Sequence, residues 1–129
     1  MNKNKFIIFL VCFFVGGLLY AQSSGEVYTI VDEPASFKGG MSGFYTYVGN
    51  SIKYPSIASR NKTQGKVVIQ FIVNPDGKLS DIKVLKGIGD GCDEEAVRVM
   101  NSSPNWIAGK QNGEPVKVRM VVPIVFKLN

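Results

Sequence analysis

The chain contains no histidine and has two cysteines, at positions 12 and 92. Histidine is the commonest general base and the commonest metal ligand, so its absence excludes Ser-His-Asp and Cys-His catalysis and histidine-based zinc sites. Charged residues make up only 19% of the chain, whereas the hydrophobic share of 45% is ordinary for a globular protein. The composition therefore indicates a folded domain and argues against an enzyme, and we expect no cofactor and no metal.

Residues 1–21 have the pattern of a targeting segment. Two lysines precede an apolar run of sixteen residues from Phe6 to Ala21, and a polar Gln-Ser-Ser follows. This run is shorter than the roughly 20 residues that a membrane-spanning helix usually needs. We therefore expect a cleaved signal peptide at 1–21 and one exported domain at 22–129. A short amino-terminal anchor that stays uncleaved is the alternative.

The expected mature domain is weakly basic. Removing Lys3 and Lys5 lowers the formal net charge from +5 to +3, and the remaining basic residues are interleaved with apolar ones. That pattern is typical of solvated strand faces and not of a nucleic-acid-binding patch. Cys92 would be the single cysteine, so no internal disulfide forms and a hydrophobic core must supply the stability.

Two helices are predicted. Apolar residues at helical spacing indicate a helix of about eight to ten residues, with Ser42 as its candidate cap. It must end before Pro55, which can itself begin a short helical turn. A second helix is expected to begin at 93–95, because acidic side chains favour the positive end of the helix dipole, and to end at Pro104. The apolar residues of the first helix are Phe44, Tyr47, Val48 and Ile52.

Three strands are predicted, after a short extended segment at 26–31. Segments 66–74 and 78–86 are β-rich and are joined by Asn-Pro-Asp-Gly, which indicates a hairpin with a positive φ at Gly77. The segment 116–128 alternates strictly, with apolar residues at the even-numbered positions, and this alternation fixes its register. Pro123 cannot donate a ladder hydrogen bond, which favours an edge position for this strand.

The order of these elements predicts an α+β fold with a three-stranded mixed sheet and helices packed on one face. A right-handed crossover makes 78–86 and 116–128 parallel, which places 66–74 between them. The connection 105–115 is expected to be a loop in which Trp106 fills a gap in the core.

Two groups of residues could carry chemistry, and a structural explanation is favoured for both. The carboxylates Asp90, Asp93, Glu94 and Glu95 could bind a hard cation or act as acids and bases, but their position at a helix start explains them. The glycines Gly87, Gly89 and Gly91 resemble a phosphate loop without its lysine and hydroxyl residues, so turn geometry explains them better.

Cys92 is the third candidate. It lies where a helix amino terminus would lower the pKa of a thiol, yet no basic residue or second cysteine is near it in the sequence. A small buried or capping residue is the favoured interpretation, and an intermolecular disulfide is the alternative.

The edge of the predicted sheet is the remaining candidate site. An exposed edge presents unpaired N–H and C=O groups, which a partner peptide can use by adding a strand of its own. No catalytic residue is required for this. The candidate partner-binding strand comprises Val116, Lys117, Val118, Arg119, Met120, Val121, Val122, Ile124, Val125, Phe126 and Lys127.

An ordered series of motifs over roughly residues 28–129 resembles the carboxyl-terminal domain of TonB, in the form common among Bacteroidetes-type proteins. No single motif is diagnostic, but their order is specific. The series comprises Pro34, Phe37 to Gly40, Phe44, Tyr47, Ile52 to Ala58, Gly65 to Gly77, Val84, Gly87 to Gly89, Gly91 to Arg98, Pro104 to Trp106, Gly109 to Gly113, Pro115-Val116 and Val122 to Phe126.

The resemblance implies a periplasmic αβ domain whose last strand captures a short extended peptide, the TonB box, at the amino terminus of an outer-membrane receptor. Full transducers of this kind add a membrane anchor and a long proline-rich spacer. In this sequence about ten residues separate Ala21 from the domain, and they reach at most about 35 Å when extended. We therefore expect a free-standing periplasmic interaction domain linked to TonB-dependent transmembrane transport.

The partner implied is a peptide of an outer-membrane TonB-dependent receptor, another periplasmic protein, or a second copy of the chain in a homodimer. We expect no nucleic-acid partner, and membrane contact only if the amino-terminal helix is retained. One alternative is an energy transducer held in the inner membrane by that helix. The other is a thiol or acidic-site enzyme that uses Cys92 or Glu95.

Overall fold

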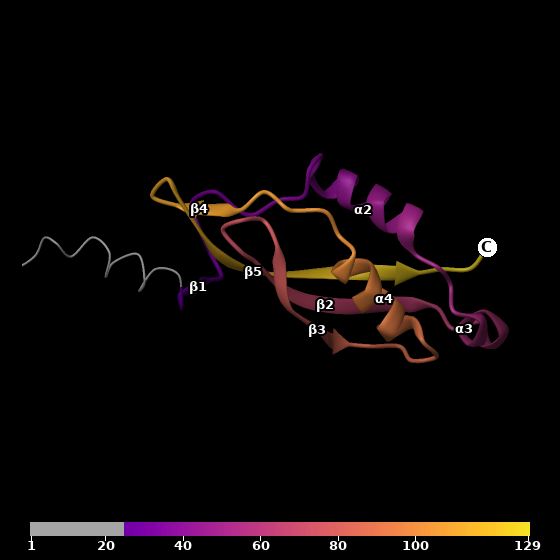
Figure 1. Cartoon of the computed structure of the whole chain (residues 1–129). Helices are drawn as coiled ribbons and strands as arrows, with labels where there is room; N and C mark the ends of the chain where they lie inside the picture. The colour runs from indigo at the N-terminus through magenta and orange to yellow at the C-terminus, as the bar shows by residue number, and fades with distance from the viewer. Residues whose placement is uncertain (1–24) are drawn as a thin grey trace, which may run out of the picture.

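The computed structural model describes residues 25–129 (Figure 1). The targeting segment expected at 1–21 lies outside the described residues. None of the helices within 25–129 has the length and apolar character needed to span a membrane. In chain order the elements are β1 (Val27–Tyr28), α2 (Gly40–Ser51), α3 (Ser56–Asn61), β2 (Gly65–Val73), β3 (Leu79–Lys86), α4 (Cys92–Asn101), β4 (Gly109–Gln111) and β5 (Glu114–Phe126).

The strands form one mixed sheet in the order β1-β5-β2-β3, and β4 pairs with β5 beside this path. β2 is antiparallel to both β3 and β5, so these two run parallel to each other, as the crossover predicts. The α+β class and the position of β2 between β3 and β5 are confirmed. The prediction of three strands is wrong, because the short strands β1 and β4 also pair with β5.

β4 lies within the connection 105–115, which was expected to be a loop. It forms a hairpin with β5 through a two-residue turn, Asn112-Gly113, in which both residues have positive φ, 53° and 80°. Asn-Gly is the preferred sequence for this turn, because both residues tolerate positive φ and the turn matches the twist of the strands. The hairpin signal was therefore present in the sequence.

The β2–β3 hairpin is confirmed. The N–H of Gly77 donates a 2.8 Å hydrogen bond to the carbonyl of Asn74, and the N–H of Asn74 donates one of 2.9 Å to the carbonyl of Lys78. Gly77 has the expected positive φ, 86°.

Helix α2 differs from the prediction in its N-cap and in its length. Its N-cap is Gly39, which has a φ of 86° and makes no side-chain cap hydrogen bond. Ser42 is therefore not the cap; it lies inside the first turn, and its hydroxyl donates to the carbonyl of Gly39 over 3.5 Å. The helix has 12 residues rather than eight to ten. The short helix α3 begins directly after Pro55, as expected.

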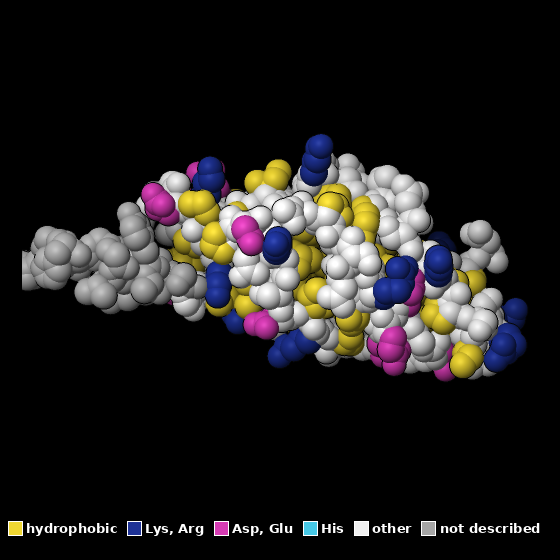
Figure 2. Space-filling model, viewed as in Figure 1, with side chains coloured by type: hydrophobic (Ala, Val, Ile, Leu, Met, Phe, Trp, Pro, Cys, Tyr) yellow, Lys and Arg dark blue, Asp and Glu magenta, His cyan; other side chains and the backbone are white. Residues whose placement is uncertain are grey.

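Helices α2 and α4 cover one face of the sheet. Phe44 and Val48 of α2 are buried with Ala96, Val99 and Met100 of α4 against the strands. On the side of the molecule seen in Figure 2, side chains of both charge signs are mixed over the surface. Nineteen residues between Ala35 and Phe126 form one core cluster, so this part of the chain has a hydrophobic core of its own and should fold as an independent unit.

Trp106 fills a gap in that core, as predicted. Only 4% of the residue is exposed, and its ring lies 5.1–5.4 Å from the rings of Phe37, Phe44 and Phe71. Its indole N–H donates to the hydroxyl of Ser103 over 3.0 Å, so the one polar group of the ring is satisfied.

The alternation of β5 is also confirmed. Five even-numbered residues, Val116, Val118, Val122, Ile124 and Phe126, are at most 7% exposed on the helix side, whereas the odd-numbered Val121 and Val125 are 51% and 48% exposed on the opposite side.

Candidate functional site

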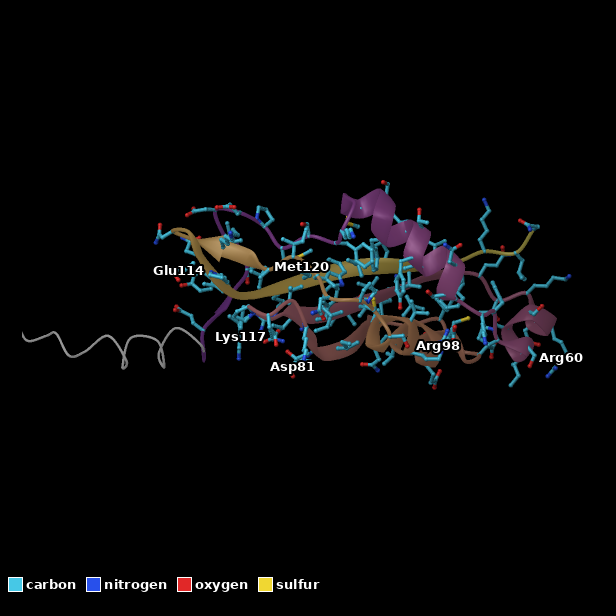
Figure 3. All side chains as sticks on the ribbon, turned by 45° about the horizontal axis from the view of Figure 1, so that its top comes forward. Arg60, Asp81, Arg98, Glu114, Lys117 and Met120 are labelled. Atoms are coloured by element: carbon cyan, nitrogen blue, oxygen red, sulfur yellow. The ribbon has the colours of Figure 1, made fainter. Side chains whose placement is uncertain are left out.

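β5 pairs with different strands along its length. β4 pairs with Glu114–Val116, and β2 pairs with β5 from Val118 to Phe126. β1 pairs in parallel with Lys117 and Val118 on the side away from β2, and Lys117 lies at the β1 end of the strand (Figure 3). Within residues 25–129 no strand pairs with the outer side of Arg119–Phe126, which we call the open edge.

Of the eleven residues predicted to bind a partner, three are already paired with β4 or β1, seven lie in the open edge, and Lys127 lies just past the end of β5. Val116 is paired with Gly109 of β4, while Lys117 and Val118 are paired with β1. Pro123, which favoured an edge position, lies in the open edge. No local sequence pattern marks β1 as a competitor for this edge, because its pairing connects residues that are far apart in the chain.

The open edge is regular, whereas the opposite edge of the sheet is not. Nine consecutive residues of β2 pair with β5 without a register shift. β3, at the other edge, has two register shifts against β2, and Asp81 within it has a φ of 51°. Bulges of this kind twist an edge and hinder further pairing. β5 therefore offers the better template for an added strand.

A strand added at the open edge would have two different faces. Met120, Val122 and Ile124 of β5 point to the helix side, while Arg119 and Val121 are exposed on the opposite side. Side chains of an added strand alternate in the same way. Side chains on the helix side of the added strand would lie beside the apolar residues of β5 at the border of the core. Side chains on the opposite side would lie beside Arg119 and the exposed Val121.

Cys92 is a buried residue at the start of α4, which confirms the structural interpretation. It has no exposed surface. Burial raises the pKa of its thiol, and the charges of Asp93, Asp90 and Glu94 raise it further. A high pKa and a lack of solvent access both disfavour the reactive thiolate form.

The acidic residues near α4 accept hydrogen bonds from separate parts of the chain. One carboxylate oxygen of Asp93 accepts hydrogen bonds from the N–H groups of Ile88 (2.8 Å) and Gly89 (3.3 Å). Asp90 accepts from the hydroxyl of Thr63 and the amide of Asn61, and these hydrogen bonds lower the pKa of its carboxyl.

Glu95 has a different set of partners. It accepts hydrogen bonds from the guanidinium of Arg98 and from the backbone N–H of Lys53, the shortest at 2.7 Å. Arg98 also donates to the carbonyl of Ser51 over 2.8 Å, so the pair ties α4 to the end of α2. The hydrogen bonds from Arg98 are the main cause of a lowered pKa at Glu95.

These carboxylates do not converge on a common point. Among the described residues no three His, Cys, Asp or Glu side chains are placed to hold a metal ion. The glycines before α4 serve the turn, as expected. Gly91 caps the helix with a φ of 88°, and a Cβ on Gly87 would lie 2.2 Å from the carboxylate of Asp93.

A hollow of about 300 Å³ lies between β3 and the end of α4, with Lys78, Ile82, Met100 and Pro104 in its lining. Lys78 is its one ionisable residue. The hollow therefore brings no acid–base pair together.

Comparison with known proteins places the chain in a family. The model of the Gram-negative bacterial TonB protein C-terminal matches residues 50–128. A solution structure of the Helicobacter pylori TonB C-terminal domain is 25% identical, with a TM-score of 0.51 over 67% of this chain and 91% of that one. A longer fragment of the same domain is 26% identical, with a TM-score of 0.49 over 65% and 76% of the two chains.

A solution structure of the Pseudomonas aeruginosa TonB C-terminal domain is 22% identical, with a TM-score of 0.45 over 60% of this chain and 79% of that one. No curated protein matches the chain. This family is linked to TonB-dependent transport. Because the family model spans more than half of the chain, this protein belongs to the family of Gram-negative bacterial TonB C-terminal domains.

Proposed function

We propose that residues 22–129 form a periplasmic interaction domain that binds an extended peptide by strand addition at the open edge. The peptide proposed is the TonB box of an outer-membrane TonB-dependent receptor. The observation that carries this proposal is the regular, unbulged run Arg119–Phe126, whose outer side has no strand partner within residues 25–129. Main-chain hydrogen bonds would supply affinity, and the alternating neighbours on β5 would supply selectivity.

The expected interaction is modest in strength. Each main-chain hydrogen bond contributes about 0.5–1.5 kcal/mol net, and each cross-strand side-chain pair about 0.2–1 kcal/mol. Ordering an extended peptide opposes these gains. A weak and reversible complex suits a contact that must be made and released.

Nuclear magnetic resonance tests this proposal directly. Isotope-labelled protein 22–129 is titrated with synthetic peptides from the amino termini of outer-membrane receptors. We expect amide shifts and slower hydrogen exchange along Arg119–Phe126, and none along Leu79–Lys86, which serves as the matched control edge. Shifts confined to β3 or to the loops would refute strand addition at β5.

Peptide variants provide a second control that leaves the protein unchanged. In a strand bound at an edge, alternate N–H groups point to the protein and the others point to solvent. N-methylation of one alternating set should therefore abolish binding, and N-methylation of the other set should preserve it. Equal effects of the two sets would mean that the peptide does not bind as a strand.

An energy transducer that retains its amino-terminal segment is the second candidate function. An intact mass near 14.1 kDa in the membrane fraction would support it. A smaller mass in the periplasmic fraction would support the free-standing domain.

A further inference from the structure

The face of the sheet that lies opposite the helices carries a concentration of positive charge. Residues paired across an antiparallel ladder lie on the same face, so the register identifies the members of this face. Lys66 pairs with Val125, and Arg119 pairs with Ile72. Lys86 and Lys83 of β3 pair with residues of β2. Lys117 of β5 pairs with β1. We call this set the basic face: Lys66, Lys83, Lys86, Lys117 and Arg119.

The net charge of the whole chain does not reveal this local excess of basic residues. The strands β2, β3 and β5 contain these five basic residues and two acidic ones, Asp81 and Glu114. Asp81 lines a hollow with Lys83 and Arg119, while Glu114 is next to the β4–β5 turn. Most acidic residues of the chain lie in the helices and connections, so the modest net charge is the sum of a basic face and a near-neutral remainder.

The cations of the basic face are not neutralised within the domain. Among the described residues the only ion pair joins Arg98 and Glu95, which lie on α4. Five like charges on adjacent strands repel one another, so a partner with negative charge would be favoured by charge complementarity.

The type of residue on this face indicates the type of partner. Four of its five cations are lysines, and its exposed apolar residues include Val121 and Val125, each about half exposed. Protein interfaces are depleted in lysine at their centres and use aromatic residues and arginine as anchors. None of the residues of β2, β3 or β5 on this face is aromatic. Lysines dispersed over a flat surface with small aliphatic groups between them fit an anionic lipid headgroup layer better.

The connection to the amino terminus points in the same direction. Val27 pairs with Lys117, and five residues separate Val27 from the apolar run that ends at Ala21. Fully extended, this connection spans about 20 Å. In the alternative in which the apolar run is retained in a membrane, it would hold one end of the basic face close to the lipid surface.

We propose that the basic face of this domain rests on an anionic lipid surface, while the open edge of β5 stays available for a peptide. The lipid contact uses the face of the sheet and strand addition uses its edge, so the two interactions do not exclude each other. Binding would be electrostatic and reversible. Salt would weaken it, because salt screens the attraction between surface charges.

Vesicle co-sedimentation tests the proposal with residues 22–129, which carry the whole described core and lack the apolar run. The vesicles contain phosphatidylglycerol and phosphatidylethanolamine, and vesicles of phosphatidylcholine serve as the neutral control. We expect sedimentation with the anionic vesicles at low salt, loss of binding in 0.5 M salt, and none with the neutral vesicles. Equal sedimentation with both kinds of vesicle would overturn the proposal.

Two matched triple variants separate the basic face from net charge. Lys66→Gln, Lys86→Gln and Arg119→Gln remove three charges from the face, and the partition coefficient should fall about fivefold for each of them. The control variant, which removes three charges elsewhere, should keep nearly full binding; its substitutions are Lys38→Gln, Lys53→Gln and Lys62→Gln. Circular dichroism checks that both variants are folded.

Equal weakening by the two variants would overturn the proposal, because binding would then depend on net charge alone. Failure to bind anionic vesicles, together with face-dependent binding of polyglutamate, would also overturn it and would indicate an acidic protein partner. Neither result depends on peptide binding at the open edge, which the amide-shift titration measures separately.

Discussion

The backbone N–H of Trp106 donates a 2.8 Å hydrogen bond to the carbonyl of Gly77. This bond fastens the turn of the β2–β3 hairpin to the residue that fills the centre of the aromatic cluster. The contact is close enough that a Cβ on Gly77 would lie 2.3 Å from the carbonyl oxygen of Trp106. Two elements far apart in the sequence therefore depend on one glycine.

Gly77→Ala should lower the free energy of unfolding by at least about 2 kcal/mol, because it combines a positive φ with a backbone clash. Gly113→Ala is the matched control: its φ of 80° is similar, but nothing lies within 4 Å of the added Cβ. It should cost about 1–2 kcal/mol. Urea unfolding followed by the fluorescence of Trp106 measures both, and equal losses would contradict the importance of the close contact.

The register of β5 predicts opposite outcomes for two adjacent substitutions. Val122 is 2% exposed on the helix side, and Val121 is 51% exposed on the other side. Val122→Asp buries a charge and should prevent stable folding, or cost more than about 4 kcal/mol. Val121→Asp should change the free energy of unfolding by no more than about 0.5 kcal/mol. Circular dichroism during urea unfolding distinguishes them, and the reverse result would mean that the strand is shifted by one residue.

Glu95 makes part of the stability pH-dependent. Its pKa in the folded domain lies below its ordinary value of 4.5, so the folded state binds the proton more weakly than the unfolded state. The stabilisation is therefore fully present above that ordinary value and is lost as the pH falls through the lowered pKa.

Glu95→Gln should lower the free energy of unfolding at pH 7, and its difference from the natural chain should shrink as the pH falls below 4.5. Urea unfolding at several values between pH 7 and pH 3 measures this difference. Arg98→Gln, which removes the main hydrogen-bond donor, should reproduce the effect. A difference that stays constant over this range would show that the hydrogen bonds to Glu95 do not control it.

Cys92 should be almost inert in the folded domain. In residues 22–129, where it is the single cysteine, alkylation by iodoacetamide at pH 8 should be on the order of 100-fold slower than in urea, because reaction requires the burial site to open. Mass spectrometry of timed samples gives the rate. Comparable rates in the two conditions would contradict the buried environment and revive a role for the thiol.

Local patterns predicted the parts of the fold that depend on short-range physics. The β2–β3 hairpin follows from Asn-Pro-Asp-Gly, and the buried face of β5 follows from strict alternation. The start of α2 was predicted wrongly because Ser42 is a typical helix cap by residue type. The actual N-cap is Gly39, which has a positive φ. Trp106 was placed correctly, since an isolated large aromatic residue in a loop usually fills a core.

The short strands could not be predicted in the same way. β1 has two residues and gains its conformation from pairing with Lys117 and Val118, ninety positions later in the chain. β4 has three residues, and only the Asn112-Gly113 turn beside it carries a local signal. The candidate edge was consequently predicted as one continuous strand, because no local pattern shows where another part of the chain already occupies it.

β1 also limits the length of any strand that can be added at the open edge. Because it occupies the edge at Lys117 and Val118, the free template begins at Arg119 and ends at Phe126. Eight residues at about 3.3 Å each span about 26 Å. A bound segment that follows the whole template therefore has a defined length, and a longer one must first displace β1. Deleting β1 would free Lys117 and Val118 as well, and would therefore lengthen the available template by two residues without any change to β5.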